Sequence, residues 1–199
     1  IYFLLSFFFL GIGISLSKFF ISNKITYFAK SSIPLMGIFV FGNFLVFTNF
    51  FINLSNFYFL VFLILIGFYF VFKNFKDLLK YKIYYFNLLI LFISSFNIGI
   101  SKDANLYHLQ QQSWLRDEKI VFGLSNINPF LGYSSIMEYI NSIFWINGNF
   151  IVIHFIGLYI VASVFELVFK LLFSNSTKDN NIAYIFIIIG VLDNFGLGG

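Results

Sequence analysis

The sequence predicts an all-α, polytopic transmembrane helical bundle of about six membrane helices, with an outer-face loop that contains short amphipathic helices. Two observations predict this fold class. The chain is 60% hydrophobic and only 10% charged, whereas a soluble domain carries about 25% charged residues. Apolar runs long enough to cross a hydrocarbon core of about 30 Å also recur along the chain.

The six apolar runs are the expected membrane helices. The second contains Pro34 near its start, which suits the first turn of a helix. They cover residues 1–16, 33–52, 57–72, 83–100, 150–173 and 182–192. The chain therefore divides into four N-terminal helices (1–100), a polar loop (101–148) and two further helices (149–199). It starts at Ile1 and ends in a Gly-rich stretch, so we expect a fragment of a longer protein.

Lysine residues distinguish the two sides of the expected bundle. Three connections carry nine of the eleven lysines, and the connection 53–56 has neither Lys nor Arg. These lysines are Lys18, Lys24 and Lys30, then Lys73, Lys76, Lys80 and Lys82, and finally Lys170 and Lys178. Because positive loops stay in the cytoplasm, the loop 101–148 is expected to face the periplasm or cell exterior. The same alternation delivers Asp103 and Asp193 to that outer face.

The polar loop begins with the pattern of a capped helix of about four turns. Asp103 fits the N-cap, where a carboxylate accepts from free N–H groups. At helical spacing one face is polar and aromatic, as suits sugar binding, and a second face suits the membrane surface. The first face holds Asp103, Tyr107, Gln110, Trp114 and Asp117; the second holds Leu106, Leu109 and Ser113. A second short helix is expected over residues 134–145.

Each polar residue also has a purely structural interpretation. Asp103 can be a plain helix cap, and Tyr107, Trp114, Tyr139 and Trp145 can be aromatic anchors at the headgroup level. Arg116 and Lys119 can bind lipid phosphate, and Glu138 fits a solvated helix position. Glu166 and Lys170, four residues apart, fit a local ion pair. His154 is placed to line the same outer cavity.

Composition excludes several classes of site. The chain has no Cys, which removes disulfides, thiolate metal sites and a Cys nucleophile. Its net charge of +4 comes from lysines spread over short loops, which is no nucleic-acid signal. With only two His residues, a structural zinc site is not expected.

The outer loop carries a recognisable pattern. It reads Asp103-x-x-Leu106-Tyr107-His108-Leu109-Gln110, followed by Trp114, Val121-x-Gly123-Leu124-x-Asn126 and Leu131-Gly132-Tyr133-x-Ser135. These 35 or so residues resemble a family of uncharacterised bacterial polytopic membrane proteins with a D-x-x-L-Y-H-L-Q motif. That family is in turn similar to the GT-C superfamily of membrane glycosyltransferases, which take sugars from polyprenyl-phosphate carriers.

The resemblance implies an enzyme of the bacterial inner membrane that builds cell-envelope glycans from a polyprenyl-phosphate sugar. Asp103 and His108 would be catalytic. The residues expected to bind substrate are Lys102, Tyr107, Gln110, Trp114, Arg116, Lys119 and Asn126. Asp193 would join Asp103 in holding a divalent metal, Mg²⁺ or Mn²⁺. Two alternatives remain open: a transporter or flippase for lipid-linked glycans, and a non-catalytic membrane scaffold.

Overall fold

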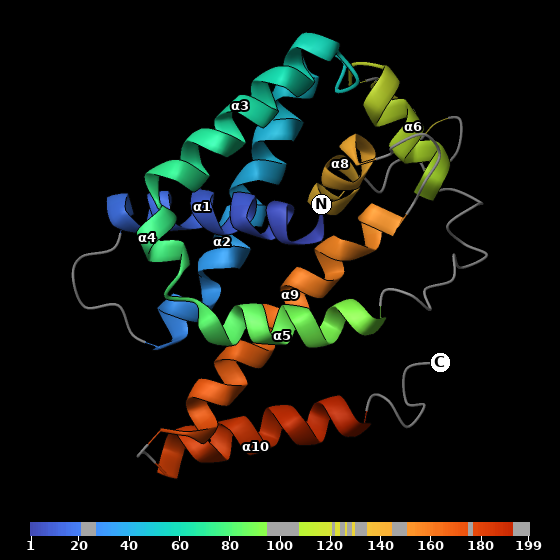
Figure 1. The fold of residues 1–199 in the computed structure, drawn as a ribbon. Helices are drawn as coiled ribbons and strands as arrows, with labels where there is room; N and C mark the ends of the chain where they lie inside the picture. Colours follow the sequence, from blue (N-terminus) through green and yellow to red (C-terminus); the bar gives the residue numbers. More distant parts are fainter. Residues whose placement is uncertain are drawn as a thin grey trace.

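Helices form all the regular secondary structure of the described residues (Figure 1). The computed structural model describes residues 1–20, 27–94, 108–120, 122–123, 126, 129, 135–144, 151–174 and 177–192. Its helices are α1 (Tyr2–Phe20), α2 (Tyr27–Asn49), α3 (Phe57–Lys73), α4 (Phe75–Leu78), α5 (Lys82–Ser94), α6 (Leu109–Asp117), α8 (Ile136–Ile143), α9 (Ile151–Leu172) and α10 (Thr177–Leu192). The expected all-helical class is confirmed for this part of the chain.

Three helical segments are long and apolar enough to cross a membrane. They are Tyr2–Phe20, Lys30–Asn49 and Val152–Leu172. At about 1.5 Å per residue, each spans close to 30 Å. Residues Phe57–Lys73 and Lys82–Ile93 form shorter apolar helices. Within the described residues, length and composition thus support a membrane protein with three crossings, fewer than the six expected.

Two helices begin earlier than the sequence pattern predicts. The prediction that Pro34 lies in the first turn of its helix was wrong, because α2 begins at Tyr27 and Pro34 lies inside it. Proline removes the N–H that the carbonyl of Lys30 would accept from, but packing against neighbouring helices makes this tolerable in a membrane bundle. α10 begins at Thr177, five residues before the apolar run, so the helix includes a polar segment that the apolar pattern could not indicate.

Close packing of α1 on α2 forms the centre of the bundle. A Cβ atom at Gly13 would collide with the backbone carbonyl of Ile33, and one at Gly37 would collide with that of Phe9. Small residues allow such backbone contact between membrane helices, where packing replaces the hydrophobic effect as the force that holds helices together. These two glycines therefore bring α1 and α2 into direct contact.

Buried polar side chains fasten the other helices to α1 and α9. Asn74, between α3 and α4, donates to the carbonyl of Gly11 at 3.0 Å and to Ser15 Oγ at 2.7 Å. The Tyr159 hydroxyl of α9 donates to the carbonyl of Tyr2 at 2.6 Å. In membrane bundles such interhelical bonds contribute about 0.6 kcal/mol each on average. They fix the positions of the α3–α4 junction and of α9 relative to α1.

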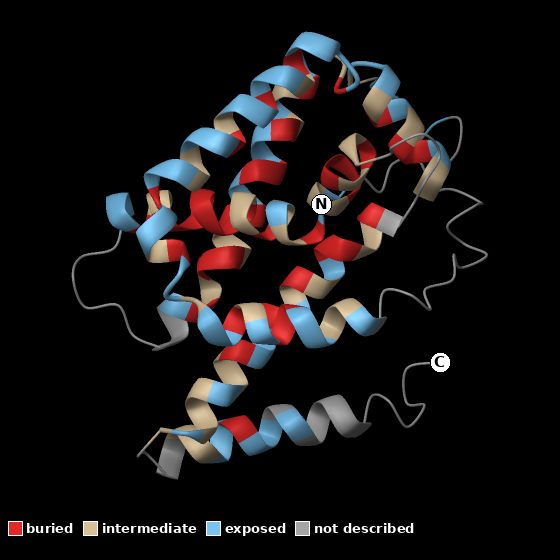
Figure 2. Ribbon diagram, viewed as in Figure 1, coloured by how far each residue is buried: buried red, intermediate tan, exposed pale blue. Residues whose placement is uncertain are grey.

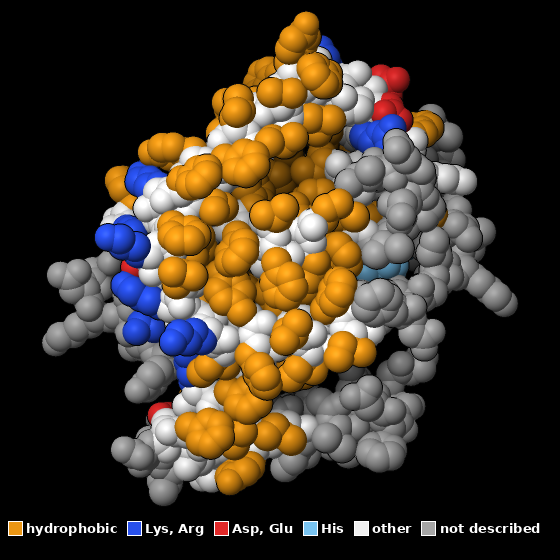
Figure 3. Space-filling view, in the orientation of Figure 1, with side chains coloured by type: hydrophobic (Ala, Val, Ile, Leu, Met, Phe, Trp, Pro, Cys, Tyr) orange, Lys and Arg blue, Asp and Glu red, His pale blue; other side chains and the backbone are white. Residues whose placement is uncertain are grey.

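The outward surface of the bundle is apolar. Figure 2 shows buried residues gathered on α1, α2, α8 and α9, while α3 presents an exposed side along its length. The exposed apolar residues of α3 are Phe57, Tyr58, Val61, Phe62, Ile64, Leu65, Phe68, Tyr69 and Phe72. In Figure 3 hydrophobic side chains form a broad continuous area, with lysines gathered at one end of it. An apolar surface of this extent is suited to lipid.

The lysines of three separate connections meet at one end of the bundle. Lys18 and Lys30 flank the α1–α2 connection, Lys80 and Lys82 precede α5, and Lys170 closes α9; all five line one cavity. The opposite end of α2, at Asn49, contacts the residues around α6. The 20-residue segment between Lys30 and Asn49 separates the two ends by about 30 Å.

Candidate functional site

The candidate site lies where α6 meets α8, and α6 is held there by its C-terminal carbonyl groups. The buried Asn49 amide donates to the carbonyls of Leu115 (3.1 Å) and Glu118 (2.9 Å). Asn53 donates to the carbonyl of Asp117 at 2.7 Å. The last carbonyls of a helix have no partner within the helix. The two asparagines supply partners from the end of α2 and the turn after it, so α6 is docked on the bundle.

α8 is packed inside the bundle against α2 and α6. Ser135 caps it, its Oγ accepting from the N–H of Glu138 at 3.3 Å. A Cβ atom at Gly42 of α2 would collide with the Ile136 side chain. Tyr139 is 5% exposed, so the expectation that it is a headgroup anchor was wrong. Burial also raises the pKa of Tyr139, which keeps its hydroxyl protonated.

Three polar side chains meet between the two helices. His108 Nδ1 lies 2.6 Å from Glu138 Oε1. Gln112 Nε2 donates to the other carboxylate oxygen, Oε2, at 2.6 Å. His108 and Gln112 are four residues apart, which places them on one face at the start of α6. Both carboxylate oxygens of Glu138 are therefore hydrogen-bonded by side chains from α6.

Burial differs sharply across this cluster. The Glu138 side chain is 10% exposed, whereas the His108 side chain is 43% exposed. A buried carboxylate that accepts from Nδ1–H fixes the imidazole in the tautomer whose basic nitrogen is Nε2. The same carboxylate stabilises the imidazolium that forms when Nε2 takes a proton. This arrangement can serve general acid–base chemistry.

The other described candidates lie on the opposite side of α6 or beyond its end. Gln110 and Trp114 are exposed on the same helix face, as predicted. The buried residues of α6 are Gln111, Gln112 and Leu115. Arg116 is paired with Asp117, Nε to Oδ1 at 3.1 Å. Lys119 and Asn126 are exposed further along the chain.

Four of the predicted site residues lie outside the described residues. They are Lys102, Asp103, Tyr107 and Asp193. The predicted Asp103–Asp193 metal site therefore stays a prediction. In the ranges that are described, no group of three or more His, Asp or Glu side chains is arranged to hold a metal ion.

Comparison with known proteins assigns the chain to a family. A family model described as "Domain of unknown function (DUF8201)" matches residues 1–196. The chain belongs to this family. No curated protein and no solved structure matches the chain. What the site does must therefore be argued from its own geometry.

Sequence reasoning missed Glu138 and Gln112. The solvated position expected for Glu138 was wrong, since this residue is 7% exposed. Its burial depends on α6, which is 21 or more residues away in the chain, so no local pattern indicates it. The S-x-x-E spacing of Ser135 and Glu138 is a capping signature, and here the glutamate side chain turns to α6 instead. The expected Glu166–Lys170 ion pair is confirmed, at 2.5 Å.

Proposed function

We propose that this protein is an integral membrane glycosyltransferase that takes a sugar from a polyprenyl-phosphate carrier, with His108 as the general base and Glu138 as its positioning partner. The observation that carries the proposal is the 2.6 Å contact between His108 Nδ1 and the buried Glu138 carboxylate. A half-exposed imidazole held by a buried acid is a common arrangement for proton transfer. The resemblance of the surrounding residues to membrane glycosyltransferases supplies the reaction class.

The proposed reaction is a displacement at the anomeric carbon of the sugar. Nε2 of His108 takes the proton of an acceptor hydroxyl, and the acceptor oxygen bonds to the anomeric carbon. The bond from that carbon to the phosphate oxygen breaks, and polyprenyl phosphate leaves with the bonding electrons. Glu138 stabilises the imidazolium during this step. A positioned base of this kind contributes about 10²–10⁴-fold to the rate.

Other residues of the loop are assigned to substrate. Trp114 and Gln110, exposed on α6, suit stacking on a sugar ring and bonding its hydroxyls. Arg116 and Lys119 follow at the end of the helix, where positive charge would balance the departing phosphate. Asp103, five residues before His108, is kept as a second acid–base candidate.

The proposal places the His108–Glu138 pair at the outer face of the bacterial inner membrane. Two facts support this orientation. The lysines of three connections converge at one end of the bundle, and positive connections stay in the cytoplasm. α6 is docked at the other end, on Asn49 and Asn53.

Purified protein in proteoliposomes, supplied with radiolabelled polyprenyl-phosphate sugars, tests the proposal. Glu138→Gln and His108→Gln should lower sugar transfer about 10²-fold or more. A matched control makes the same chemical change elsewhere: Glu118→Gln at an exposed position. This control should retain activity. Thermal unfolding of each variant in detergent checks that the fold survives.

A pH profile distinguishes a catalytic role of the His108–Glu138 pair from a purely structural one. If His108 is the base, kcat/KM of the wild type rises with pH on the acidic side of the profile, and that limb disappears in His108→Gln. Folded Glu138→Gln and His108→Gln variants that transfer sugar at the wild-type rate would contradict the proposal. That result would leave the pair as a structural contact between α6 and α8.

A further inference from the structure

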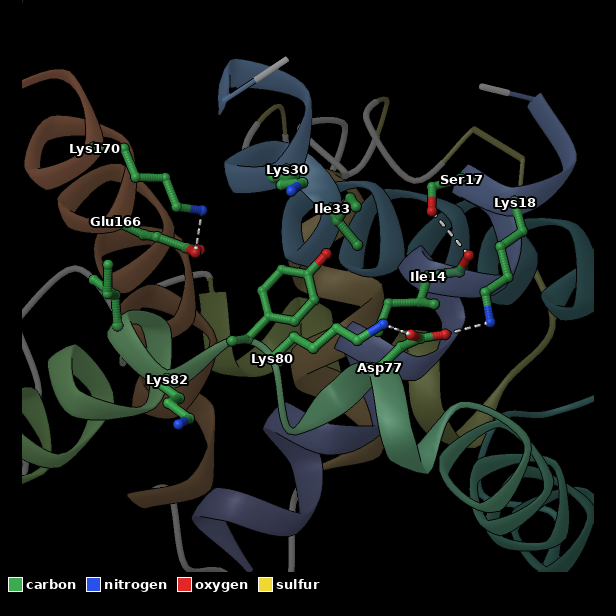
Figure 4. Close-up of a pocket in the computed structure, with 12 residues that line it drawn as sticks. Ile14, Ser17, Lys18, Lys30, Ile33, Asp77, Lys80, Lys82, Glu166 and Lys170 are labelled. Carbon is green, nitrogen blue, oxygen red and sulfur yellow. Dashed lines mark hydrogen bonds and ion pairs between the residues drawn. The ribbon is translucent and has the colours of Figure 1, made fainter. Parts of the chain in front are cut away.

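A second polar site lies at the lysine-bearing end of the bundle. A cavity of about 560 Å³ opens there between α1, α2, α5 and α9 (Figure 4). Its polar lining consists of Ser17, Lys18, Lys30, Asp77, Lys80, Tyr81, Lys82, Glu166 and Lys170. Its apolar lining is Ile14, Ile33 and Ile83. Because the residues come from helices far apart in sequence, the folded bundle creates this cavity.

Positive charge exceeds negative charge in the cavity. Asp77 is bound by two lysines, Lys18 and Lys80, each at 2.6 Å. Glu166 is paired with Lys170. Five lysines against two carboxylic acids give the lining a formal net charge of +3.

Two of the five lysines, Lys30 and Lys82, are outside the ion pairs of the described residues. Within the described ranges, no carboxylate lies at ion-pair distance from Lys30 or Lys82. Both are exposed residues that line the cavity, Lys30 from α2 and Lys82 from the start of α5 (Figure 4). Lys30 has only a longer-range attraction to Glu166, and cations that are not held in ion pairs around a concave surface are suited to bind an anion.

The surroundings of the cavity favour an anion that is carried by a lipid. Exposed apolar residues follow two of the lining lysines in the chain: Phe19 and Phe20 come directly after Lys18, and Phe86 lies one helical turn after Lys82. A volume of 560 Å³ also exceeds what one inorganic phosphate fills. The ligand should also carry a hydrogen-bond donor for Glu166, because the buried Oε2 of this residue has no donor in the part of the chain described. A headgroup that combines phosphate with hydroxyl groups supplies both an anion for the lysines and a hydrogen-bond donor for Glu166.

We propose that this cavity binds the phosphate headgroup of an anionic membrane lipid, with Lys30 and Lys82 as its principal phosphate contacts. Basic pockets between membrane helices on the cytoplasmic side recognise anionic headgroups in this way. Phosphatidylglycerol has the required phosphate and hydroxyl groups. The inference is independent of the proposed transferase activity, since no residue that lines the cavity belongs to α6 or α8.

Native mass spectrometry of the protein released from nanodiscs tests the lipid site. The nanodiscs contain equal amounts of phosphatidylglycerol and phosphatidylcholine. The wild type should retain phosphatidylglycerol preferentially. Lys30→Gln combined with Lys82→Gln should weaken retention about thirtyfold, the equivalent of about 1 kcal/mol for each lysine near a membrane surface. Lys30→Arg with Lys82→Arg should retain the lipid, because the charge is kept.

A matched pair of lysines controls for general attraction to an anionic surface. Lys73 and Lys76 are exposed near the same end but do not line the cavity. Lys73→Gln with Lys76→Gln removes the same charge and should leave retention unchanged. Equal losses in both double variants would overturn the site. Tight binding of inorganic phosphate without retained phosphatidylglycerol would assign the cavity to a soluble anion and overturn the lipid assignment.

Discussion

The energetic importance of single residues here follows from how completely each polar group is partnered. Glu138 has both oxygens bonded inside the protein, to His108 and Gln112. Removing one partner of a buried charge costs far more than the pair contributes, because an uncompensated charge is left behind. Replacing His108 therefore leaves the buried Glu138 carboxylate without one of its partners. Glu138→Gln removes the buried charge itself, so this variant is the cleaner test of function.

Asp77 gives a prediction about pH. Hydrogen bonds from Lys18 and then Lys80 hold its pKa below the ordinary value of 3.8. A carboxyl whose folded pKa is depressed stabilises the fold above its unfolded pKa, and this contribution is lost as the pH falls through the folded pKa. Asp77→Asn should therefore lower stability by about 1 kcal/mol at pH 7, and the difference should vanish as the pH falls well below 4.

Thermal unfolding in detergent over a pH series measures this effect. The matched control is Asp117→Asn, because Asp117 is 48% exposed and pairs with one neighbouring Arg116. It should change stability less than Asp77→Asn at pH 7. A stability difference between wild type and Asp77→Asn that grows as the medium is acidified would show that the sign is wrong.

At the scale of elements, the arrangement of the site depends on how α6 is anchored. Asn49 is fully buried and bonds carbonyls at the end of α6. Asn49→Ala should leave those carbonyls without donors and destabilise the protein by about 1–3 kcal/mol. It should also increase hydrogen exchange of the α6 amides and lower sugar transfer, because His108 lies at the start of α6.

An asparagine on the same helix provides the control. Asn43 is exposed and donates within α2, to the carbonyl of Phe39 at 2.8 Å. Asn43→Ala should change neither α6 exchange nor transfer. If Asn49→Ala left α6 as protected as it is in the wild type, the two asparagine bonds would not be what docks this helix.

Sequence patterns predicted elements better than contacts between elements. Apolar runs located α1, α3 and α9 to within a few residues, because lipid-facing helices are apolar along their length. The start of α2 was misplaced because Pro34 was taken for a boundary, although packing keeps the helix continuous past it. His108 was identified from its motif, but Glu138 was not, since its burial depends on the tertiary contact of α8 with α6.

At the scale of the whole molecule, the bundle separates two kinds of polar chemistry. A His–Glu pair lies between α8 and α6, whose C-terminal end is docked on α2 at Asn49. A lysine-rich cavity lies beside Lys30, at the other end of α2. The apolar helices between them span about 30 Å, the thickness of a hydrocarbon core. If the helices cross a bilayer, the two sites face opposite compartments. Both the transferase and the lipid proposals assume this.

Single-cysteine labelling of the protein in intact cells tests that separation most directly, and the chain itself has no Cys. Gln110→Cys, exposed on α6, and Lys76→Cys, exposed on α4, place one thiol at each end. A membrane-impermeant maleimide should label the first variant in intact spheroplasts and the second only after permeabilisation. Labelling of both from the same side, or of Lys76→Cys alone in intact spheroplasts, would contradict the account.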